Sequence, residues 1–220
     1  MPLQSRWYRL RRIVKRRPGR LVVMLWLTAL CACSAALAST PTHAGRSPGP
    51  WCGGASWRLM TLSDPDRRKV HLDRIPTSIA NLDALAPPRT IGLRRTTGFQ
   101  LVSWRMQVVI DRYRIASNGE IVLVLYDIPS GKYMDAYLPN PHCLGERARD
   151  RTGMIAARKQ FTDHCPQATS QWQLLGASVD VSGVGFWNPV HTTRGALPNG
   201  AELRPLTNLS IIAGCGIGTG

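Results

Sequence analysis

The residues best suited to bind a ligand lie near the C-terminus, in a loop rich in Gly, Pro and Thr and in the strand expected after it. The candidate ligand-binding residues there are His191, Thr193, Arg194, Asn199, Glu202 and Arg204. Arginine presents paired N–H donors that match anionic groups in a way that lysine cannot. We therefore expect this loop to contact any ligand, and none of these residues is predicted to bind a metal ion.

Two local interpretations compete with a ligand-binding role. Asn199-Gly200 is a typical turn sequence, because both residues tolerate the backbone angles of tight turns. Glu202 and Arg204 stand two apart in a predicted strand, so their side chains point to the same face and could form an ion pair. His191, alone in a loop, is also explained as a solvated histidine.

Three tyrosines extend the candidate site onto predicted strands. Tyr126, Tyr133 and Tyr137 are expected on or beside one open face of the sheet, where aromatic rings can stack on bases or sugar rings. Packing against neighbouring side chains is the alternative role. The predicted ligand face thus comprises these strands and the loop 188–199.

The strands around this site follow from the period of two in apolar residues. Residues 101–116 alternate up to Ile110 and then change phase at Tyr113, which indicates a bulge or sharp coil. In residues 172–187 the phase changes after Val181, so a second bulge is expected at Ser182-Gly183. Residues 117–119 form a predicted hairpin turn.

The order of elements predicts the fold class. Strands are expected at residues 101–116, 121–126, 132–138, 172–187 and 202–212, with a helix at residues 146–161. Three strands, a helix and two strands, the first strand long and bent, is the order of a mainly β, OB-fold-like five-stranded barrel with its helix between strands 3 and 4. A β-sandwich with one helix is the alternative.

The first 38 residues are predicted to be a signal peptide. Residues 1–20 carry eight Lys or Arg and no acid, residues 21–32 are apolar but too short to span a bilayer stably, and Ala36 and Ala38 suit signal peptidase. Two alternatives remain, a lipoprotein anchored at Cys33 and a retained membrane anchor. Arg11-Arg12 also resembles a twin-arginine signal, although Ile13-Val14 fits it poorly.

The rest of the chain divides into three parts. Residues 39–50 are predicted to be a disordered linker, residues 51–100 an N-terminal extension packed on the barrel, and residues 101–220 the barrel domain. Within the extension, short strands are expected at residues 57–62 and 69–72 and a helical turn or two at residues 77–85. We expect an exported protein, periplasmic or extracellular, without membrane contact beyond a signal peptide or lipid anchor.

Charge and cysteines narrow the function. The formal net charge is +15, of which the leader supplies eight, and the remaining +7 is not by itself a nucleic-acid-binding balance. Four cysteines follow the leader, and an even number in an exported protein predicts two disulfides. We expect Cys143–Cys165 and Cys52–Cys215; their spacing argues against a metal site.

Several segments resemble a group of small exported bacterial proteins. The similar segments are residues 118–125, 133–143 and 183–206, and the likeness extends from about Thr61 to Ile212. The resemblance implies the fold and export but no activity. This chain has Val122, Tyr137 and Arg204 where that pattern has a histidine, a glutamate and a second histidine, so any metal or acid–base site made by those groups is lost here.

The motifs of common enzyme classes are missing from the sequence. It has no G-x-S-x-G, no HExxH and no glycine-rich phosphate loop after a strand. The predicted function is therefore a non-catalytic binding module without a cofactor, with nucleic acid or glycan as candidate ligands. The alternative is a metal-independent hydrolase or nuclease on the barrel, using acids among Asp111, Glu120, Asp135 and Glu202 with Arg204.

Overall fold

The computed structural model describes residues 52–215. The predicted signal peptide at residues 1–38, the linker at residues 39–50 and Cys33 lie outside these residues, so those assignments stay predictions. Across the described part of the chain, no helix is both long and apolar enough to cross a membrane.

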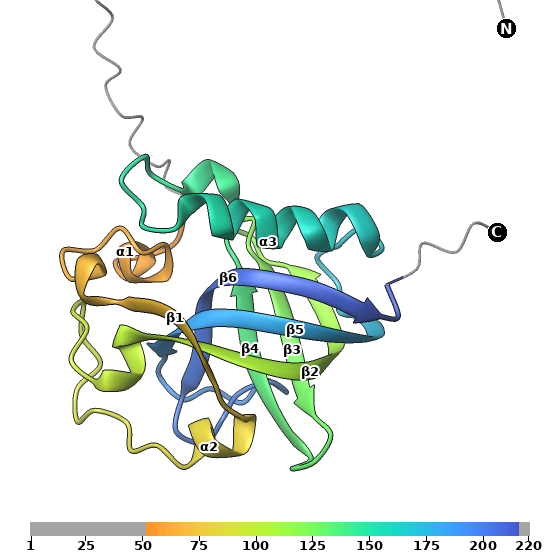
Figure 1. Cartoon of the computed structure of the whole chain (residues 1–220), viewed down its shortest axis with the longest axis horizontal. Coiled ribbons are helices and arrows are strands. Elements are labelled where there is room, and N and C mark those ends of the chain that lie inside the picture. Colours follow the sequence, from red (N-terminus) through yellow and green to blue (C-terminus); the bar gives the residue numbers. More distant parts are fainter. Residues whose placement is uncertain (1–51, 216–220) are drawn as a thin grey trace, which may run out of the picture. The chain divides into compact units, whose positions relative to one another are not determined.

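Five strands close into a barrel. They are β2 (Val102–Ile115), β3 (Ile121–Asp127), β4 (Lys132–Leu138), β5 (Gln173–Trp187) and β6 (Ala201–Ala213). Their order is β2-β3-β4-β6-β5, and β5 pairs back onto β2 to close the ring (Figure 1). Only β4 and β6 run parallel within it. The mainly β, OB-fold-like barrel is confirmed, with its one long helix between the third and fourth barrel strands.

Strand β2 closes the ring because it pairs with β3 on one edge and with β5 on the other. Both registers shift between Ile110 and Arg112: opposite β3, Asp111 is the extra residue of a bulge, whereas opposite β5 it faces two residues, Leu175 and Gly176. Met106, Val108, Ile110 and Tyr113 can therefore all reach the core. The bulge predicted from the change of phase is confirmed, and it supplies the coiling that a small barrel needs.

The second predicted irregularity is present at Ser182-Gly183, but its extra residues lie in β6 and not in β5. The pairing of β5 with β2 runs without a shift from Ala177 to Val184, so β5 alternates regularly there. The irregularities arise opposite, where β6 has more residues than β5 between Ser182 and Gly185. Val184 packs against Leu62, Val70 and Leu72 of the N-terminal extension instead of the barrel core. The apolar pattern changed because the extension covers that face.

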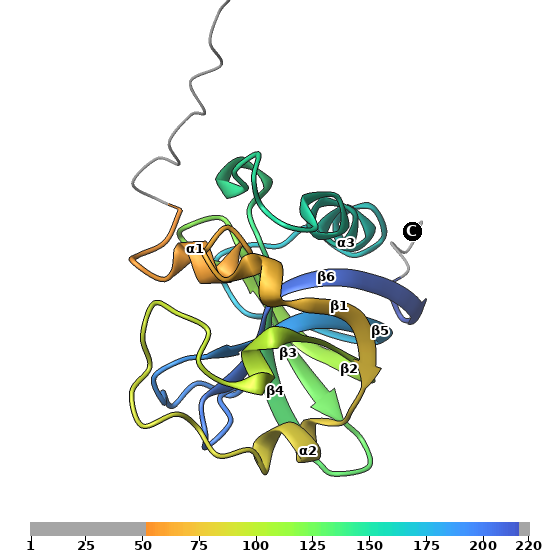
Figure 2. The ribbon, with the colours of Figure 1, turned by 60° about the vertical axis from the view of Figure 1, so that its left-hand side comes forward.

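The extension, residues 52–101, runs along one side of the barrel (Figure 2). It contains α1 (Trp57–Met60), a 3-10 turn (Arg67–Lys69), β1 (His71–Pro76), α2 (Ile79–Asp83) and a second 3-10 turn (Gly98–Leu101). Strand β1 adds to β2 in parallel. The strand expected at residues 57–62 is instead the helical turn α1, which buries Leu59, followed by Leu62 with a φ of 51°. The strand at 69–72 starts later, at His71, and the helix near 77–85 is confirmed.

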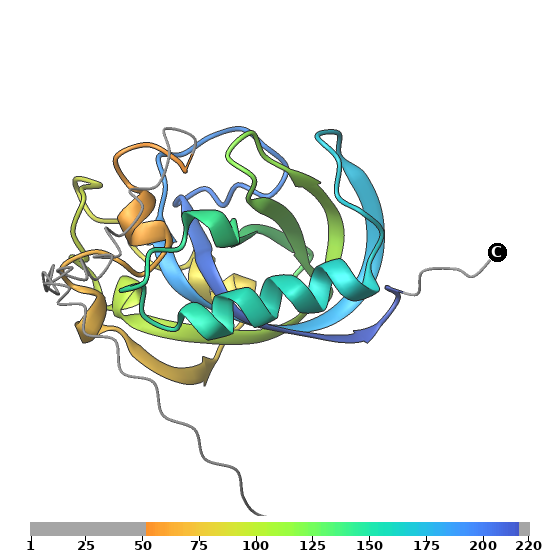
Figure 3. The ribbon, with the colours of Figure 1, turned by 90° about the horizontal axis from the view of Figure 1, so that it is seen from above.

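Helix α3 (Arg151–His164) lies across one end of the barrel (Figure 3). It buries the predicted stripe of Met154, Ala157 and Phe161. The helix begins later than expected because the chain turns before it: the Ala148 amide bonds to the Gly145 carbonyl, and Asp150 has a φ of 54°. A 3-10 turn (Pro141–Cys143) connects β4 to this region.

All four cysteines form disulfides, but the predicted pairing is wrong. Cys52 is bonded to Cys143 and Cys165 to Cys215, with Cα–Cα distances of 5.3 and 4.6 Å. Cys143 and Cys165 flank the 14-residue α3, which is about 21 Å long at 1.5 Å per residue, so they cannot meet. Each disulfide instead ties one end of α3 to a distant segment, and two such bonds are typical of an oxidising compartment.

Alanine at Gly185 should destabilise the barrel. A Cβ there would lie 2.2 Å from the Phe99 carbonyl oxygen, a backbone atom that cannot rotate away. We expect Gly185→Ala to lower the free energy of unfolding by about 1–3 kcal/mol, the usual cost of overpacking. Gly54→Ala is the matched control, since a Cβ at Gly54 meets nothing within 4 Å. Equal urea midpoints for the two variants would contradict this packing.

Candidate functional site

The candidate site lies on the outer face of β4 and β6, beneath the loop that joins β5 to β6. In β4, Met134, Ala136 and Leu138 face the barrel core, so Tyr133, Asp135 and Tyr137 face outward. In β6, Leu203 is in the core, and Glu202 and Arg204 face outward. Ala136 pairs with Leu203, which brings these outward residues together.

The sequence led us to expect an open face here, and that prediction is wrong. Val124, Asp135 and Glu202 are at most 2% exposed. The loop at residues 188–200 contacts it through side chains, since Thr193 bonds to Asp135 and His191 to Glu202. A ligand can therefore reach only its margin while the loop stays in place.

Asp135, His191 and Glu202 form a compact acidic cluster with one imidazole. His191 Nε2 lies 3.1 Å from Glu202 Oε1 and 3.9 Å from Asp135 Oδ2. One ligand atom from each residue falls within 4.8 Å of the other two. The sequence predicted no metal ligands, but the fold brings together three groups that can bind a cation.

Neighbouring polar groups hold this cluster in place. Thr193 Oγ1 lies 2.7 Å from His191 Nδ1 and also donates to Asp135 Oδ2 at 3.3 Å. Asn188 Nδ2 donates to Glu202 Oε1 at 2.8 Å. The imidazole ring is therefore fixed through its far nitrogen, and its Nε2 is directed at the two carboxylates.

Gly195 lets the loop backbone lie directly on Asp135. A Cβ at this position would come within 1.6 Å of Asp135 Oδ1, so no other residue fits without moving the loop or the Asp135 carboxylate. Glycine is the residue that permits such close approach of backbone to another group.

The pKa values of Asp135, His191 and the neighbouring Tyr137 are raised in this environment. Burial, together with the charge of Glu202, raises the pKa of Asp135 to about 6. The hydrogen bond to Glu202 raises the pKa of His191. Burial raises the pKa of Tyr137 as well, so its hydroxyl stays protonated near neutral pH. Two carboxylates thus compete for protons or for a cation in a site that water scarcely reaches.

Arg204 is a buried structural residue here. It forms an ion pair with Glu120, with its Nε 3.3 Å from Glu120 Oε1, and its guanidinium stacks 4.0 Å from the centre of the Tyr137 ring. The ion pair expected between Glu202 and Arg204 does not form, because Glu202 is bonded to His191. At 8% exposure, Arg204 has no free surface for a ligand.

The three departures from the resembling family lie next to one another. Val122 pairs with Tyr137 across β3 and β4, and Arg204 covers the Tyr137 ring. The positions of that pattern's histidines and glutamate are therefore occupied by an apolar, an aromatic and a cationic residue, and Glu120 neutralises the cationic one, Arg204. The acidic cluster beside them is a different set of residues.

Tyr126, Tyr133 and Arg194 lie together at the accessible margin of this face. The rings of Tyr126 and Tyr133 are 4.7 Å apart, and the Arg194 guanidinium lies 4.8 Å from the Tyr133 ring centre. Arg194 also donates to the Tyr133 hydroxyl at 3.1 Å and pairs with Asp111 of the β2 bulge at 3.1 Å. We call these three residues the aromatic rim.

Asn199 has a structural role. Its amide nitrogen donates to the carbonyls of Leu82, Asp83 and Leu85, and its oxygen accepts from the Ala201 amide. With Gly200 at a φ of 74°, the pair forms the predicted turn and fastens the loop to the end of α2. The residue predicted for ligand contact therefore has its hydrogen-bonding groups already in use.

The sequence-based ligand set left out Asp135, which appeared only as one of several acids for a hydrolase. Its signal was a charged residue in the middle of the otherwise apolar and aromatic strand YMDAYL. A buried carboxylate needs partners, and those of Asp135 are His191 and Thr193 in the loop, more than 55 residues later in the chain.

Comparison with protein-family models, with curated proteins and with solved structures found no significant match. The resemblance to the exported bacterial proteins therefore stays a prediction, and the function is inferred from the site alone.

Replacing Arg204 should lower the free energy of unfolding. The Arg204→Ala variant leaves Glu120 buried without its partner, for which we expect a loss of about 3–5 kcal/mol in the free energy of unfolding. Arg194→Ala is the matched control: its side chain is 47% exposed, so a change within about 0.5 kcal/mol is expected. Chemical denaturation measures both, and equal stabilities would show that the Glu120–Arg204 pair contributes nothing.

Replacing Asp135 should change how stability depends on pH. The folded-state pKa of Asp135 is raised from 3.8 to about 6, so its favourable contribution is present below pH 3.8 and is lost as the pH rises through 6. Measured in EDTA, Asp135→Asn should gain on wild type across this window, by at most about 3 kcal/mol at neutral pH. Asp163→Asn, an exposed carboxyl on α3, is the control. A difference between Asp135→Asn and wild type that does not vary with pH would contradict the assignment.

Proposed function

We propose that this protein is an exported, non-catalytic binding module that holds a glycan at the aromatic rim. The observation that carries the proposal is the column formed by Tyr126, Tyr133 and Arg194 beside the loop 188–199. OB barrels bind oligosaccharides and oligonucleotides through this face and its adjoining loops.

The rim has the groups that a sugar ring requires. Tyrosine offers a flat apolar face for the C–H side of a pyranose and a hydroxyl that can hydrogen-bond to the sugar hydroxyls. Its side chain has few rotatable bonds, so ordering it on binding costs little conformational entropy. Arg194 and Asp111, joined at 3.1 Å, provide donors and an acceptor for vicinal hydroxyls. Tyr126 and Tyr133 are only partly buried, so a ligand can approach them without opening the loop.

The local charge favours a glycan over a nucleic acid. The cations around the tyrosines are largely neutralised: Arg194 and Arg112 share Asp111, and Lys132 pairs with Asp83, so three cations meet two acids. Nucleic-acid binding depends on unneutralised Lys and Arg along the path of the phosphates. A neutral polyhydroxylated ligand suits these paired charges better.

The hydrolase alternative has less support. Its best acid–base groups are Asp135 and Glu202, at 2% and 1% exposure. A general acid or base must come within hydrogen-bond reach of the scissile bond. With the loop 188–199 in place, these carboxylates are out of reach of a substrate.

Export is part of the proposal. The basic leader with its short apolar segment supports it, and so do two disulfides that fasten α3 to distant parts of the chain. Cleavage after Ala38 and lipidation at Cys33 both deliver the domain to an oxidising space.

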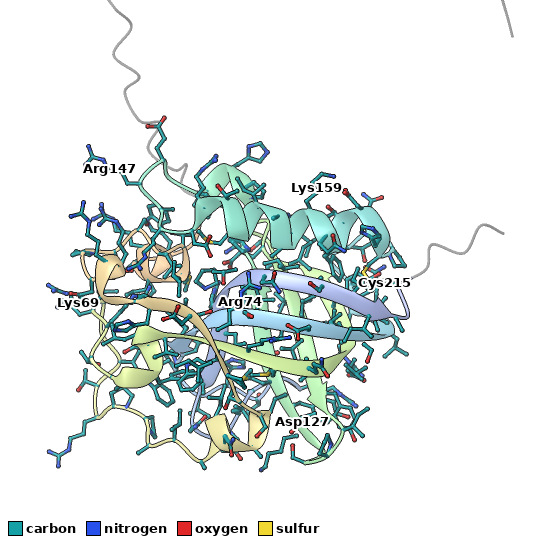
Figure 4. The ribbon with its side chains drawn as sticks, viewed as in Figure 1. Lys69, Arg74, Asp127, Arg147, Lys159 and Cys215 are labelled. Atoms are coloured by element: carbon teal, nitrogen blue, oxygen red, sulfur yellow. A yellow bond between two sulfur atoms is a disulfide. The ribbon has the colours of Figure 1, made fainter. Side chains whose placement is uncertain are left out.

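The rim can be tested by binding measurements. We expect wild type to bind at least one member of a panel of bacterial cell-envelope glycans, with Tyr133→Ala and Arg194→Ala each weakening it at least tenfold, because stacking and a paired hydrogen bond are each worth about 1–3 kcal/mol. Arg147→Ala is the matched arginine control. Arg147 lies near the start of α3, far from Asp127 (Figure 4). Asp127 follows Tyr126 directly at the end of β3 and so marks the position of the aromatic rim.

Single-stranded DNA belongs in the same panel. Binding of DNA in place of every glycan, or glycan binding that survives both rim substitutions, would contradict the proposal.

A further inference from the structure

We propose that Asp135, His191 and Glu202 bind one divalent transition-metal ion, with Zn²⁺ as the expected metal. This metal site goes beyond the proposed glycan binding and does not depend on it. One imidazole nitrogen and two carboxylate oxygens are ligands that zinc accepts in proteins, with a fourth position left for water or another group.

The spacing of the three donor atoms suits such an ion. Bonds of about 2.0–2.2 Å in a tetrahedral arrangement place neighbouring ligand atoms about 3.4 Å apart. The distances from His191 Nε2 are 3.1 Å to Glu202 Oε1 and 3.9 Å to Asp135 Oδ2. Small movements of side chains would therefore complete the coordination, without any change of backbone.

The carboxylates themselves indicate that a cation belongs here. Asp135 and Glu202 each have one oxygen, Oδ2 and Oε1, facing His191, and one buried oxygen, Oδ1 and Oε2, with no hydrogen-bond partner among the described residues. Both side chains are more than nine-tenths buried and extend towards His191. Two buried carboxylates beside one imidazole leave negative charge that a divalent ion would neutralise, and buried charges in proteins are paired or coordinate metals.

Thr193 orients His191 as a metal ligand requires. When the Thr193 hydroxyl donates to Asp135 Oδ2, His191 Nδ1–H donates to Thr193 Oγ1, which directs Nε2 at the two carboxylates. Without an ion, a proton on Nε2 bonds to Glu202 Oε1, and a metal ion would replace that proton. A hydrogen bond from the second ring nitrogen is also the usual way in which proteins fix a ligating histidine.

The cationic side chains near the cluster are engaged elsewhere. Arg204 is paired with Glu120, and the guanidinium of Arg114 lies 4.9 Å from the centre of the Trp172 ring. Neither makes a salt bridge to Asp135 or Glu202 in the described part of the chain. A metal ion would therefore compete with the proton that His191 shares with Glu202, and not with an arginine.

The ion would fasten the loop to the barrel. Asp135 comes from β4, Glu202 from β6 and His191 from the loop, so one metal would join three segments that meet only in the tertiary structure. If the aromatic rim binds a glycan, as proposed above, bound metal would also fix Arg194 in its position over Tyr133.

Metal titration of the purified chain tests the site. Cys31 and Cys33 are replaced by serine so that their thiols cannot bind the ion, and the protein is stripped with EDTA and dialysed. Isothermal titration calorimetry with Zn²⁺, Mn²⁺ and Ca²⁺ should show one saturable Zn²⁺ per chain. Free Zn²⁺ at about 100 times the Kd should raise the Tm by about 5–10 °C.

His191→Gln is the decisive variant, since it removes the imidazole and keeps a donor for Glu202. It should fold like wild type by circular dichroism and bind Zn²⁺ at least 100-fold more weakly; Asp135→Asn should also lose binding. His164→Gln, an exposed histidine on α3, should bind as wild type does. Failure of wild type to bind Zn²⁺ or Mn²⁺, undiminished binding by folded His191→Gln, or binding of Ca²⁺ alone would each overturn the proposal.

Discussion

The constraint on which the rest of the structure depends is closure of a ring by only five strands. Strand β2 must pair with β3 along one edge and with β5 along the other, so it has to coil strongly within 14 residues. The bulge at Asp111 provides this coiling while Ile110 and Tyr113 both stay in the core. Closure also removes the free edges through which a sheet of this size would otherwise pair with other chains. Arg194 then uses the bulged residue itself, Asp111, as a partner on the outer surface.

Because the ring is closed, its outer face has to be covered in another way. The extension covers the side at Val184, and the loop 188–200 covers part of the face of β4 and β6. This cover places charged groups out of contact with water, where they need partners. Glu120 finds one in Arg204, and that pair also packs on Tyr137. Asp135 and Glu202 have only His191 and neutral donors, and this imbalance distinguishes the acidic cluster from a structural ion pair.

The two disulfides and the contacts of the loop hold the covering segments in place on the barrel. Cys52–Cys143 and Cys165–Cys215 fasten the segments at either end of α3 to the extension and to the end of β6. Asn199 fastens the loop to α2 through three carbonyls. The loop is therefore anchored at its β6 end, and its middle, with His191, Thr193 and Arg194, is held by side-chain contacts that a ligand or an ion can strengthen.

The sequence by itself determined the strands, the Asp111 bulge, the buried stripe of α3 and the barrel topology. The bounds of the strand at residues 132–138 were predicted correctly, because the alternation of apolar residues and the turn residues beside it are local features of the sequence. Only the tertiary structure decided which groups meet. Arg204 is 84 residues from Glu120, Thr193 is 58 from Asp135, and the disulfides span 91 and 50 residues. No local pattern encodes those pairs, since each depends on how the ring closes and on which segment then covers it. For the same reason the disulfide pairing and the role of Arg204 were predicted wrongly, and Asp135 was left out of the predicted ligand set.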